Sequence, residues 1–111
     1  MEKETTFNKK LFDKAQSEGK IVIISSWIKY CSSCASQMKV LNQAKNEGKL
    51  LDVNFQNIEY FSFDVTNKEI AELFNVKFQT TLLIFKDNKE VYRSLGETTE
   101  DLIYQALKKT I

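Results

Sequence analysis

The chain has 111 residues, of which 42% are hydrophobic, so it suffices for one packed core and we expect a single domain over residues 1–111. Sixteen basic and fifteen acidic side chains leave a formal charge of +1, and Arg93 is the single arginine, so a nucleic-acid partner is not expected. The absence of His excludes Cys–His hydrolases, His-containing zinc sites and histidine proton shuttles.

The first half of the chain predicts a helix, a buried strand and a second helix. Residues 7–18 place apolar side chains at helical spacing, and Gly19 ends this helix. Residues 20–27 form a β-branched run without alternation, which is typical of a strand covered on both faces. From Cys31 to about Gly48, apolar residues again recur at helical spacing: Cys34, Ala35, Met38, Leu41 and Ala44. Both cysteines therefore fall in the first turn of the second helix.

The second half predicts a strand, a short helix, a hairpin and a final helix. The expected boundaries are 58–65 for the strand, 68–74 for the helix, 81–86 and 90–95 for the hairpin strands, 87–89 for their turn, and Thr98 or Thr99 to Lys109 for the last helix. Phe61, Phe63 and Val65 share one face of the first of these strands. This order of elements implies an α/β fold, a three-layer sandwich around a mixed sheet, with parallel strands first and the hairpin at an edge.

The compartment is predicted from the absence of long apolar segments and from the cysteine spacing. The longest strongly apolar runs, 21–24 and 82–85, are far short of the roughly 20 residues that cross a bilayer. The polar start of the chain, 1–4, is not followed by the apolar stretch of a signal peptide. A disulfide between cysteines three residues apart closes too short a loop to serve as a scaffold. We therefore expect a cytoplasmic protein without a membrane partner.

The two cysteines form a C-x-x-C pair, Cys31-Ser32-Ser33-Cys34, directly after the first predicted strand. The free N–H groups and the positive dipole end of the helix favour a thiolate at Cys31, with a pKa below the usual value of about 8.5. Cys34 falls on the apolar face of the helix and should be less exposed. In thiol–disulfide exchange an exposed thiolate attacks a partner's disulfide and a second thiol resolves the mixed disulfide, without a cofactor. Cys31 is thus the predicted nucleophile and Cys34 the predicted resolving thiol.

The cysteine pair is also compatible with roles outside disulfide exchange. Two cysteines in the first turn of a helix can be chemically inert. They can also be half of a tetrathiolate metal site, which would need a dimer or thiols from elsewhere, because the chain has two Cys and no His. A phosphatase loop is excluded, since it needs an arginine near the cysteine and Arg93 is far along the chain.

The segment Trp27 to Cys34 resembles the thioredoxin signature, in which a Trp precedes a C-x-x-C by four residues. Residues 80–89 resemble the family's segment after its cis-proline, and Gly96 falls where the family has a late glycine. The resemblance spans most of the chain and implies the thioredoxin fold. It also implies a monomer that exchanges disulfides with protein substrates and with an unidentified reductase or dithiol donor. The residues it places around the site are Trp27, Tyr30, Ser32, Ser33, Gln79, Thr80 and Gly96.

Several positions depart from the family. Ser32 and Ser33 replace Gly-Pro and bring two hydroxyls to the cysteines. Ser25 replaces a buried Asp that assists proton transfer to the resolving cysteine, and no Lys stands near Ser62, so that relay is expected to be missing. Lys39 replaces a helix-kinking proline, so we expect a straighter second helix.

The most consequential departure is Thr80, which replaces the family's cis-proline. Either the Gln79–Thr80 bond is cis, at a cost of roughly 2.5 to 4 kcal/mol, or it is trans and the loop is rearranged. In this superfamily the cis-proline also keeps metals away from the cysteines. Its loss supports an alternative function, a binding module that holds an iron–sulfur cluster or metal through the thiolates of two chains.

Overall fold

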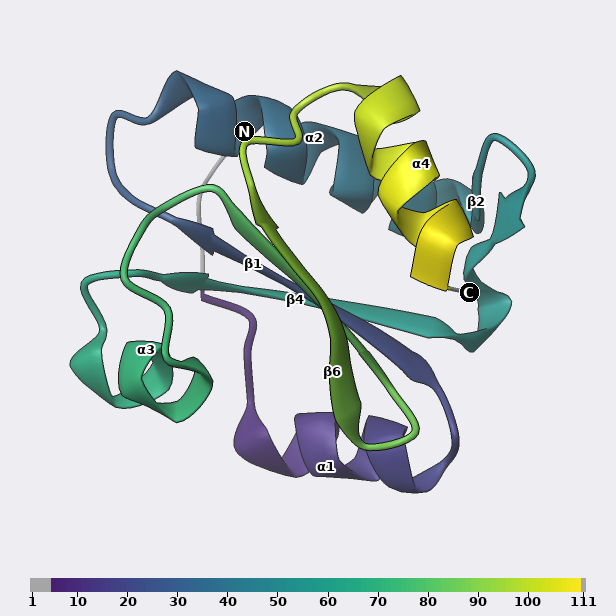
Figure 1. Cartoon of the computed structure of the whole chain (residues 1–111), viewed down its shortest axis with the longest axis horizontal. Coiled ribbons are helices and arrows are strands. Elements are labelled where there is room, and N and C mark those ends of the chain that lie inside the picture. Colours follow the sequence, from purple (N-terminus) through teal and green to yellow (C-terminus); the bar gives the residue numbers. More distant parts are fainter. Residues whose placement is uncertain (1–4, 111) are drawn as a thin grey trace.

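The computed structural model describes residues 5–110, which form a four-stranded mixed sheet between two layers of helices (Figure 1). The predicted three-layer α/β sandwich is confirmed. In chain order the elements are α1 (Lys9–Ser17), β1 (Ile21–Trp27), α2 (Ser32–Glu47), β2 (Lys49–Leu50), β3 (Val53–Asn54), the 3-10 turn η1 (Phe55–Asn57), β4 (Ile58–Asp64), α3 (Lys68–Phe74), β5 (Thr81–Lys86), β6 (Lys89–Leu95) and α4 (Glu100–Thr110).

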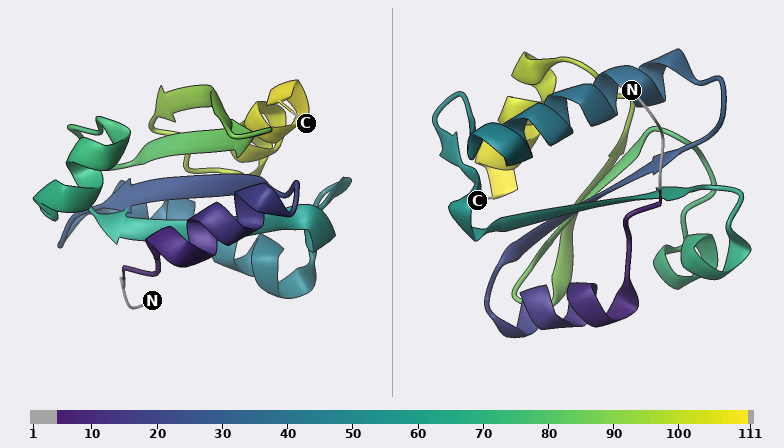
Figure 2. Two further views of the ribbon diagram at one scale, coloured as in Figure 1. Left: turned by 90° about the horizontal axis from the view of Figure 1, so that it is seen from below. Right: turned by 180° about the vertical axis from the view of Figure 1, so that it is seen from behind.

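The sheet has the strand order β4-β1-β5-β6. β1 runs parallel to β4, with Ser25 opposite Ser62, and antiparallel to β5, which pairs in turn with β6 as an antiparallel hairpin. Helices α2 and α4 cover one face of this sheet, and α1 and α3 cover the other (Figures 1 and 2). The expected order, parallel strands first and the hairpin at an edge, is confirmed.

Alternate residues of β1 face the two helical layers. Ile23 belongs to the cluster that includes Leu41 of α2 and Leu107 of α4. Val22 and Ile24 belong to the opposite cluster, which includes Phe12 of α1 and Phe74 of α3, as do Phe61 and Phe63 of β4. Because both faces of β1 are buried, its sequence shows no alternation of apolar and polar residues. At the end of β1, Trp27 packs with Cys34 and Met38 in a third, small cluster.

The helix boundaries follow from their caps. α1 begins two residues later than expected, because the side chain of Asn8 accepts hydrogen bonds from the N–H groups of Lys10 and Leu11. α2 begins at Ser32 with Cys31 as its N-cap, and it ends before Gly48, which has a left-handed φ of 74°. Both cysteines therefore lie at the first turn of α2, as expected.

Two local features differ from the expectation. The hairpin β2–β3 and η1 were not predicted, because strands of two residues carry no readable periodicity. The turn between β5 and β6 consists of two residues, Asp87 and Asn88, with φ values of 55° and 65°. Positive φ at both central residues is the requirement of a type I′ hairpin, so β6 begins one residue earlier, at Lys89.

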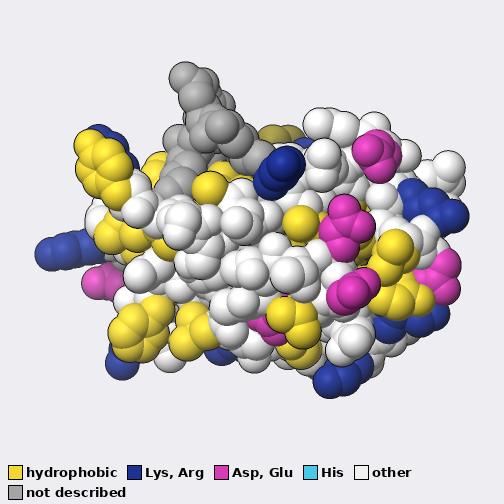
Figure 3. Space-filling model, turned by 90° about the horizontal axis from the view of Figure 1, so that it is seen from above, with side chains coloured by type: hydrophobic (Ala, Val, Ile, Leu, Met, Phe, Trp, Pro, Cys, Tyr) yellow, Lys and Arg dark blue, Asp and Glu magenta, His cyan; other side chains and the backbone are white. Residues whose placement is uncertain are grey.

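The surface is mixed in charge on the side seen from above, where Lys and acidic side chains lie among uncharged ones (Figure 3). None of the helices within residues 5–110 is long and apolar enough to cross a membrane.

Candidate active site

Cys31 and Cys34 are joined by a disulfide at the N-terminus of α2, with their Cα atoms 5.3 Å apart. The connection from β1 turns sharply at Tyr30, which has a left-handed φ of 61°. The N–H of Cys34 donates to Sγ of Cys31 over 3.2 Å. Cys34 is fully buried, whereas Cys31 is partly exposed. A reactant from solvent therefore reaches Cys31 and not Cys34.

The hydroxyl of Thr80 lies between the two cysteines and Ser33. Oγ1 of Thr80 is 3.1 Å from Sγ of Cys34, 3.6 Å from Sγ of Cys31 and 3.1 Å from Oγ of Ser33. Disulfide sulfurs carry no hydrogen, so the hydroxyl is the donor in any bond to them. Within residues 5–110, Thr80 provides the one side chain that hydrogen-bonds Sγ of Cys34.

The backbone at Thr80 shows which of the two expected arrangements is present. No peptide bond among residues 5–110 is cis, so the Gln79–Thr80 bond is trans. Thr80 has a φ of 60°, a conformation that is unfavourable for a β-branched residue. Its N–H donates to the carbonyl of Ser26 over 2.9 Å, and its own carbonyl accepts from the N–H of Gly96 over 3.1 Å. These bonds hold the strained residue in place.

Ser26 ties the whole loop before β5 to the end of β1. Its hydroxyl donates to the carbonyl of Phe78 over 2.8 Å and accepts from the N–H of Thr81 over 3.0 Å. The side chain of Phe78 remains 61% exposed. The loop is thus fixed through its backbone and leaves an aromatic side chain at the surface.

Gln37 is a second anchor of this loop, and it was not predicted from the sequence. The side chain is fully buried in α2, and its Nε2 donates to the carbonyls of Glu97 over 3.0 Å and Thr80 over 3.4 Å. Its Oε1 has no partner among the described residues. The sequence contains a pattern that indicates this role, because Gln37 is a polar residue that lies between Cys34 and Met38 on the apolar face of the helix.

Ser25 takes part in a neutral cluster of hydroxyls on the inner strands. Its Oγ is 2.7 Å from the hydroxyl of Tyr60, which also hydrogen-bonds Ser62. Burial raises the pKa of Tyr60 to about 12, against the smaller opposing effect of these two hydrogen bonds. The position that holds a carboxylate in the family therefore holds groups that stay uncharged at neutral pH.

The other site residues expected from the sequence lie at different depths. Trp27 is buried against Cys34, and its Nε1 has no partner among the described residues. Tyr30 is fully exposed, and Ser32 and Gln79 are exposed as well. Gly96 has a φ of 90° and contacts the site through its bond to Thr80. The contacts thus bring Ser33, Thr80 and Gly96 together around the disulfide.

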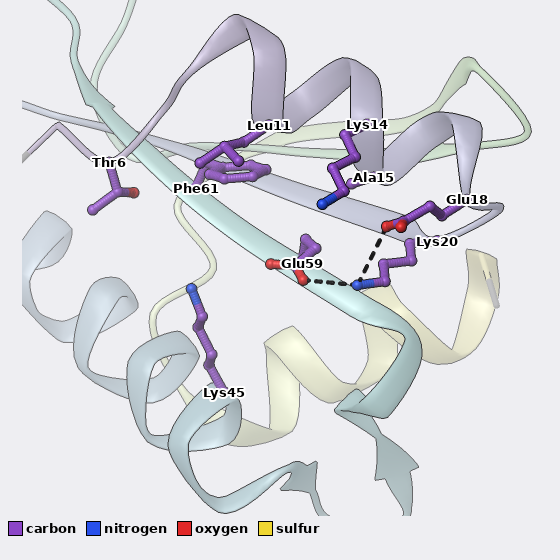
Figure 4. Close-up of a pocket in the computed structure, with 9 residues that line it drawn as sticks. All are labelled: Thr6, Leu11, Lys14, Ala15, Glu18, Lys20, Lys45, Glu59 and Phe61. Atoms are coloured by element: carbon purple, nitrogen blue, oxygen red, sulfur yellow. Dashed lines mark hydrogen bonds and ion pairs between the residues drawn. The ribbon is translucent and has the colours of Figure 1, made fainter.

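A separate cavity of about 290 Å³ lies beside α1 and β4, and none of its lining residues belongs to the cysteine site (Figure 4). Lys20, which points into this cavity, pairs with Glu59 at 3.1 Å and with Glu18 at 3.7 Å. Its charge is therefore balanced by the protein itself. Residues 5–110 contain no group of three or more His, Cys, Asp or Glu side chains arranged to hold a metal ion.

Comparisons with known proteins agree with this geometry. The sequence model of the family Thioredoxin matches residues 2–109. A thioredoxin H-type of Fagopyrum esculentum is 28% identical over 95 residues, which cover 85% of this chain and 76% of the relative. A thioredoxin H-type of Oryza sativa subsp. indica is 31% identical over 100 residues, covering 86% and 76%.

Solved structures show the same fold. Trxlp from Edwardsiella tarda superposes with a TM-score of 0.76 at 23% identity, covering 89% of this chain and 92% of that one. Thioredoxin from Fasciola hepatica superposes with a TM-score of 0.74 at 21% identity, covering 93% and 90%. At these identities the structural likeness supports the fold alone.

Proposed function

Since the chain belongs to the thioredoxin family, we propose that it is a thiol–disulfide oxidoreductase that exchanges protein disulfides through Cys31 and Cys34. The observation that carries this proposal is the asymmetric pair at the start of α2. Its two sulfurs form a disulfide, and Cys34 is fully buried whereas Cys31 is partly exposed. That asymmetry separates the attacking role from the resolving role.

In the direction of substrate reduction, the Cys31 thiolate attacks one sulfur of a partner's disulfide and forms a mixed disulfide. The other partner sulfur leaves as a thiolate and takes up a proton. Cys34 then loses its proton and attacks Sγ of Cys31, which releases the second partner thiol and forms the Cys31–Cys34 disulfide. The N–H of Cys34 and the dipole of the 16-residue helix α2 support the thiolate of Cys31.

The surface around the pair supports a protein as the substrate. Tyr30 precedes Cys31 and is fully exposed, while Phe78 and Leu95 are 61% and 59% exposed. Phe78 and Leu95 line a cavity of about 490 Å³ together with Thr81, the residue that follows Thr80. Exposed aromatic and aliphatic side chains offer apolar contacts to a polypeptide. We propose no nucleic-acid or membrane partner.

The partners are protein disulfides and a reductase or dithiol donor that regenerates the thiols, and the protein acts as a monomer in the cytoplasm. Fractionation of the source cells and size-exclusion chromatography test the last two points.

An insulin reduction assay with dithiothreitol as electron donor tests the activity. We expect the folded protein to accelerate precipitation of the insulin B chain, and Cys31→Ser to abolish that acceleration. A folded wild-type protein without any acceleration would contradict the proposal. The same preparation, purified without oxygen and analysed for iron, zinc and sulfide, tests the alternative of a cluster held between two chains, and a coloured dimer would favour that alternative.

A further inference from the structure

The resolving cysteine needs a route for its proton. Cys34 is fully buried, and thiol–disulfide exchange requires its sulfur to lose a proton when it attacks and to gain one when it leaves. Ser25 cannot serve as the base, because it carries a hydroxyl that is engaged with Tyr60. Some other group must therefore connect the Cys34 sulfur to solvent.

The contacts of Thr80 provide such a connection. Its hydroxyl is 3.1 Å from Sγ of Cys34 on one side and 3.1 Å from Oγ of Ser33 on the other. Thr80 is 5% exposed, whereas Ser33 is exposed. The three groups thus form a chain of hydrogen-bonding atoms that begins at a buried sulfur and ends at the surface.

We propose that the hydroxyls of Thr80 and Ser33 form the proton path between Cys34 and solvent, which deepens the proposed function and rests on it. When the Cys34 thiol attacks, its proton moves to Oγ1 of Thr80, the Thr80 proton moves to Oγ of Ser33, and a Ser33 proton passes to water. The Cys34 sulfur then bonds to Sγ of Cys31, and the Cys31–substrate disulfide breaks. Two electrons pass from the protein dithiol to the substrate.

The same contact serves the reverse step. When a reductant's thiolate attacks Cys31, the S–S bond to Cys34 breaks and Cys34 leaves as a buried thiolate. The hydroxyl of Thr80 already donates toward that sulfur, and its proton compensates the negative charge as it develops. Water then returns a proton through Ser33 and Thr80. The same two hydroxyls therefore serve both directions of exchange.

The conformation of Thr80 is consistent with this role. A β-branched residue at a φ of 60° persists only where surrounding bonds hold it, and here Ser26, Gly96 and Gln37 each bind its backbone. These anchors place Oγ1 at the disulfide, so Gln37 acts as a positioning residue. The titratable groups on the surrounding elements include Cys31 before α2, Tyr60 on β4 and Glu97 after β6. The hydroxyl of Ser25 hydrogen-bonds the hydroxyl of Tyr60. The hydroxyls of Tyr92 and Ser94 donate to the carboxylate of Glu97.

The reaction of the reduced protein with 5,5′-dithiobis(2-nitrobenzoate) separates the two steps. The first release of thionitrobenzoate reports attack by Cys31, and the second reports resolution by Cys34. We expect Thr80→Val to slow the second phase by about tenfold near pH 7 and to change the first phase much less, because Oγ1 lies 3.1 Å from Sγ of Cys34 and 3.6 Å from Sγ of Cys31. The difference in the second phase should shrink as pH rises and hydroxide replaces the path. Thr80→Ser, which keeps the hydroxyl, should remain within about twofold of the wild type.

Ser33→Ala tests the outer end of the path at an exposed position, with Ser36→Ala, also exposed on α2, as the matched control. We expect a slower second phase for Ser33→Ala and the wild-type rate for Ser36→Ala. If the second phase of Thr80→Val has the wild-type rate, or if the second phase of Thr80→Ser is as slow as that of Thr80→Val, the proton path is overturned. Either result leaves the proposed function intact. A wild-type protein that releases one thionitrobenzoate per chain instead of two would overturn the proposed function and the path with it.

Discussion

The side chain of Gln37 and the carbonyl of Thr80 are joined by a 3.4 Å hydrogen bond that ties helix α2 to the loop facing the disulfide. The same Nε2 holds the carbonyl of Glu97, so one buried amide fixes both loops beside the cysteines. The site thus depends on a polar residue in a helix face that is otherwise apolar.

The first prediction concerns this amide. Gln37→Leu removes the donor for the carbonyls of Thr80 and Glu97, and we expect a loss of about 1 kcal/mol in the free energy of unfolding. Urea denaturation measures it, with the exposed Gln43→Leu on the same helix as control. Amide hydrogen exchange at Thr80 and Gly96 should become faster in Gln37→Leu. Equal unfolding midpoints and unchanged exchange would show that Gln37 does not anchor the loops.

A second prediction concerns proline at position 80, the residue that the family has there. Thr80→Pro removes the N–H that donates to Ser26, and a proline ring fixes φ near −65° where the chain has 60°. We therefore expect a loss of more than about 1 kcal/mol in stability. Thr80→Ser, which keeps the N–H, should shift the urea midpoint less. A midpoint for Thr80→Pro at or above that of the wild type would mean that the chain readily adopts the family's loop.

A third prediction separates the two cysteines. Cys34→Ser should accumulate a mixed disulfide at Cys31 when mixed with a protein disulfide, because the attacking thiol is accessible and the resolving thiol is absent. Cys31→Ser should form far less adduct, since Cys34 is fully buried. Intact mass spectrometry after acid quenching measures both. Equal adduct on the two variants would contradict the assignment of roles.

A fourth prediction concerns alkaline stability and Tyr60. The folded-state pKa of Tyr60, about 12, lies above the ordinary tyrosine value of about 10, so the folded state holds the proton more tightly. The resulting stabilisation is complete below pH 10 and is lost as pH rises toward 12. Tyr60→Phe cannot lose a proton, so its stability should fall less over this range, by a difference on the order of 2 kcal/mol. Urea unfolding of the wild type and of Tyr60→Phe at pH 8, 10 and 11.5 measures this difference. An equal loss of stability with pH in the two proteins would contradict the burial of the Tyr60 hydroxyl.

Much of the fold follows from local patterns that the sequence displays. The unalternating run of β1 and the apolar stripes of α2 and α4 result directly from burial on two faces or on one face, and they predicted these elements well. The hairpin β2–β3 and the N-cap role of Cys31 depend on hydrogen bonds between a few atoms. Such contacts leave no periodic trace in a sequence.

The cysteine pair and the site around it differ in how far they could be predicted. Spacing and the preceding strand identified Cys31 and Cys34, and the greater burial of Cys34 is confirmed. The trans bond before Thr80 could not be chosen in advance, because it depends on Ser26 and Gly96 binding the Thr80 backbone across long sequence separations. The contact between Thr80 and Ser33 depends on the same loop geometry.

The most direct test of the central claim is the equilibrium of the Cys31–Cys34 couple in redox buffers of defined potential, read by alkylation and mass spectrometry. We expect both thiols to appear together in one reversible two-electron transition, with a slope of about 30 mV per tenfold change in the ratio of reduced to oxidised protein. Stable glutathione adducts on Cys31 in place of the Cys31–Cys34 disulfide, or two cysteines that stay reduced in oxidising buffer, would contradict the claim.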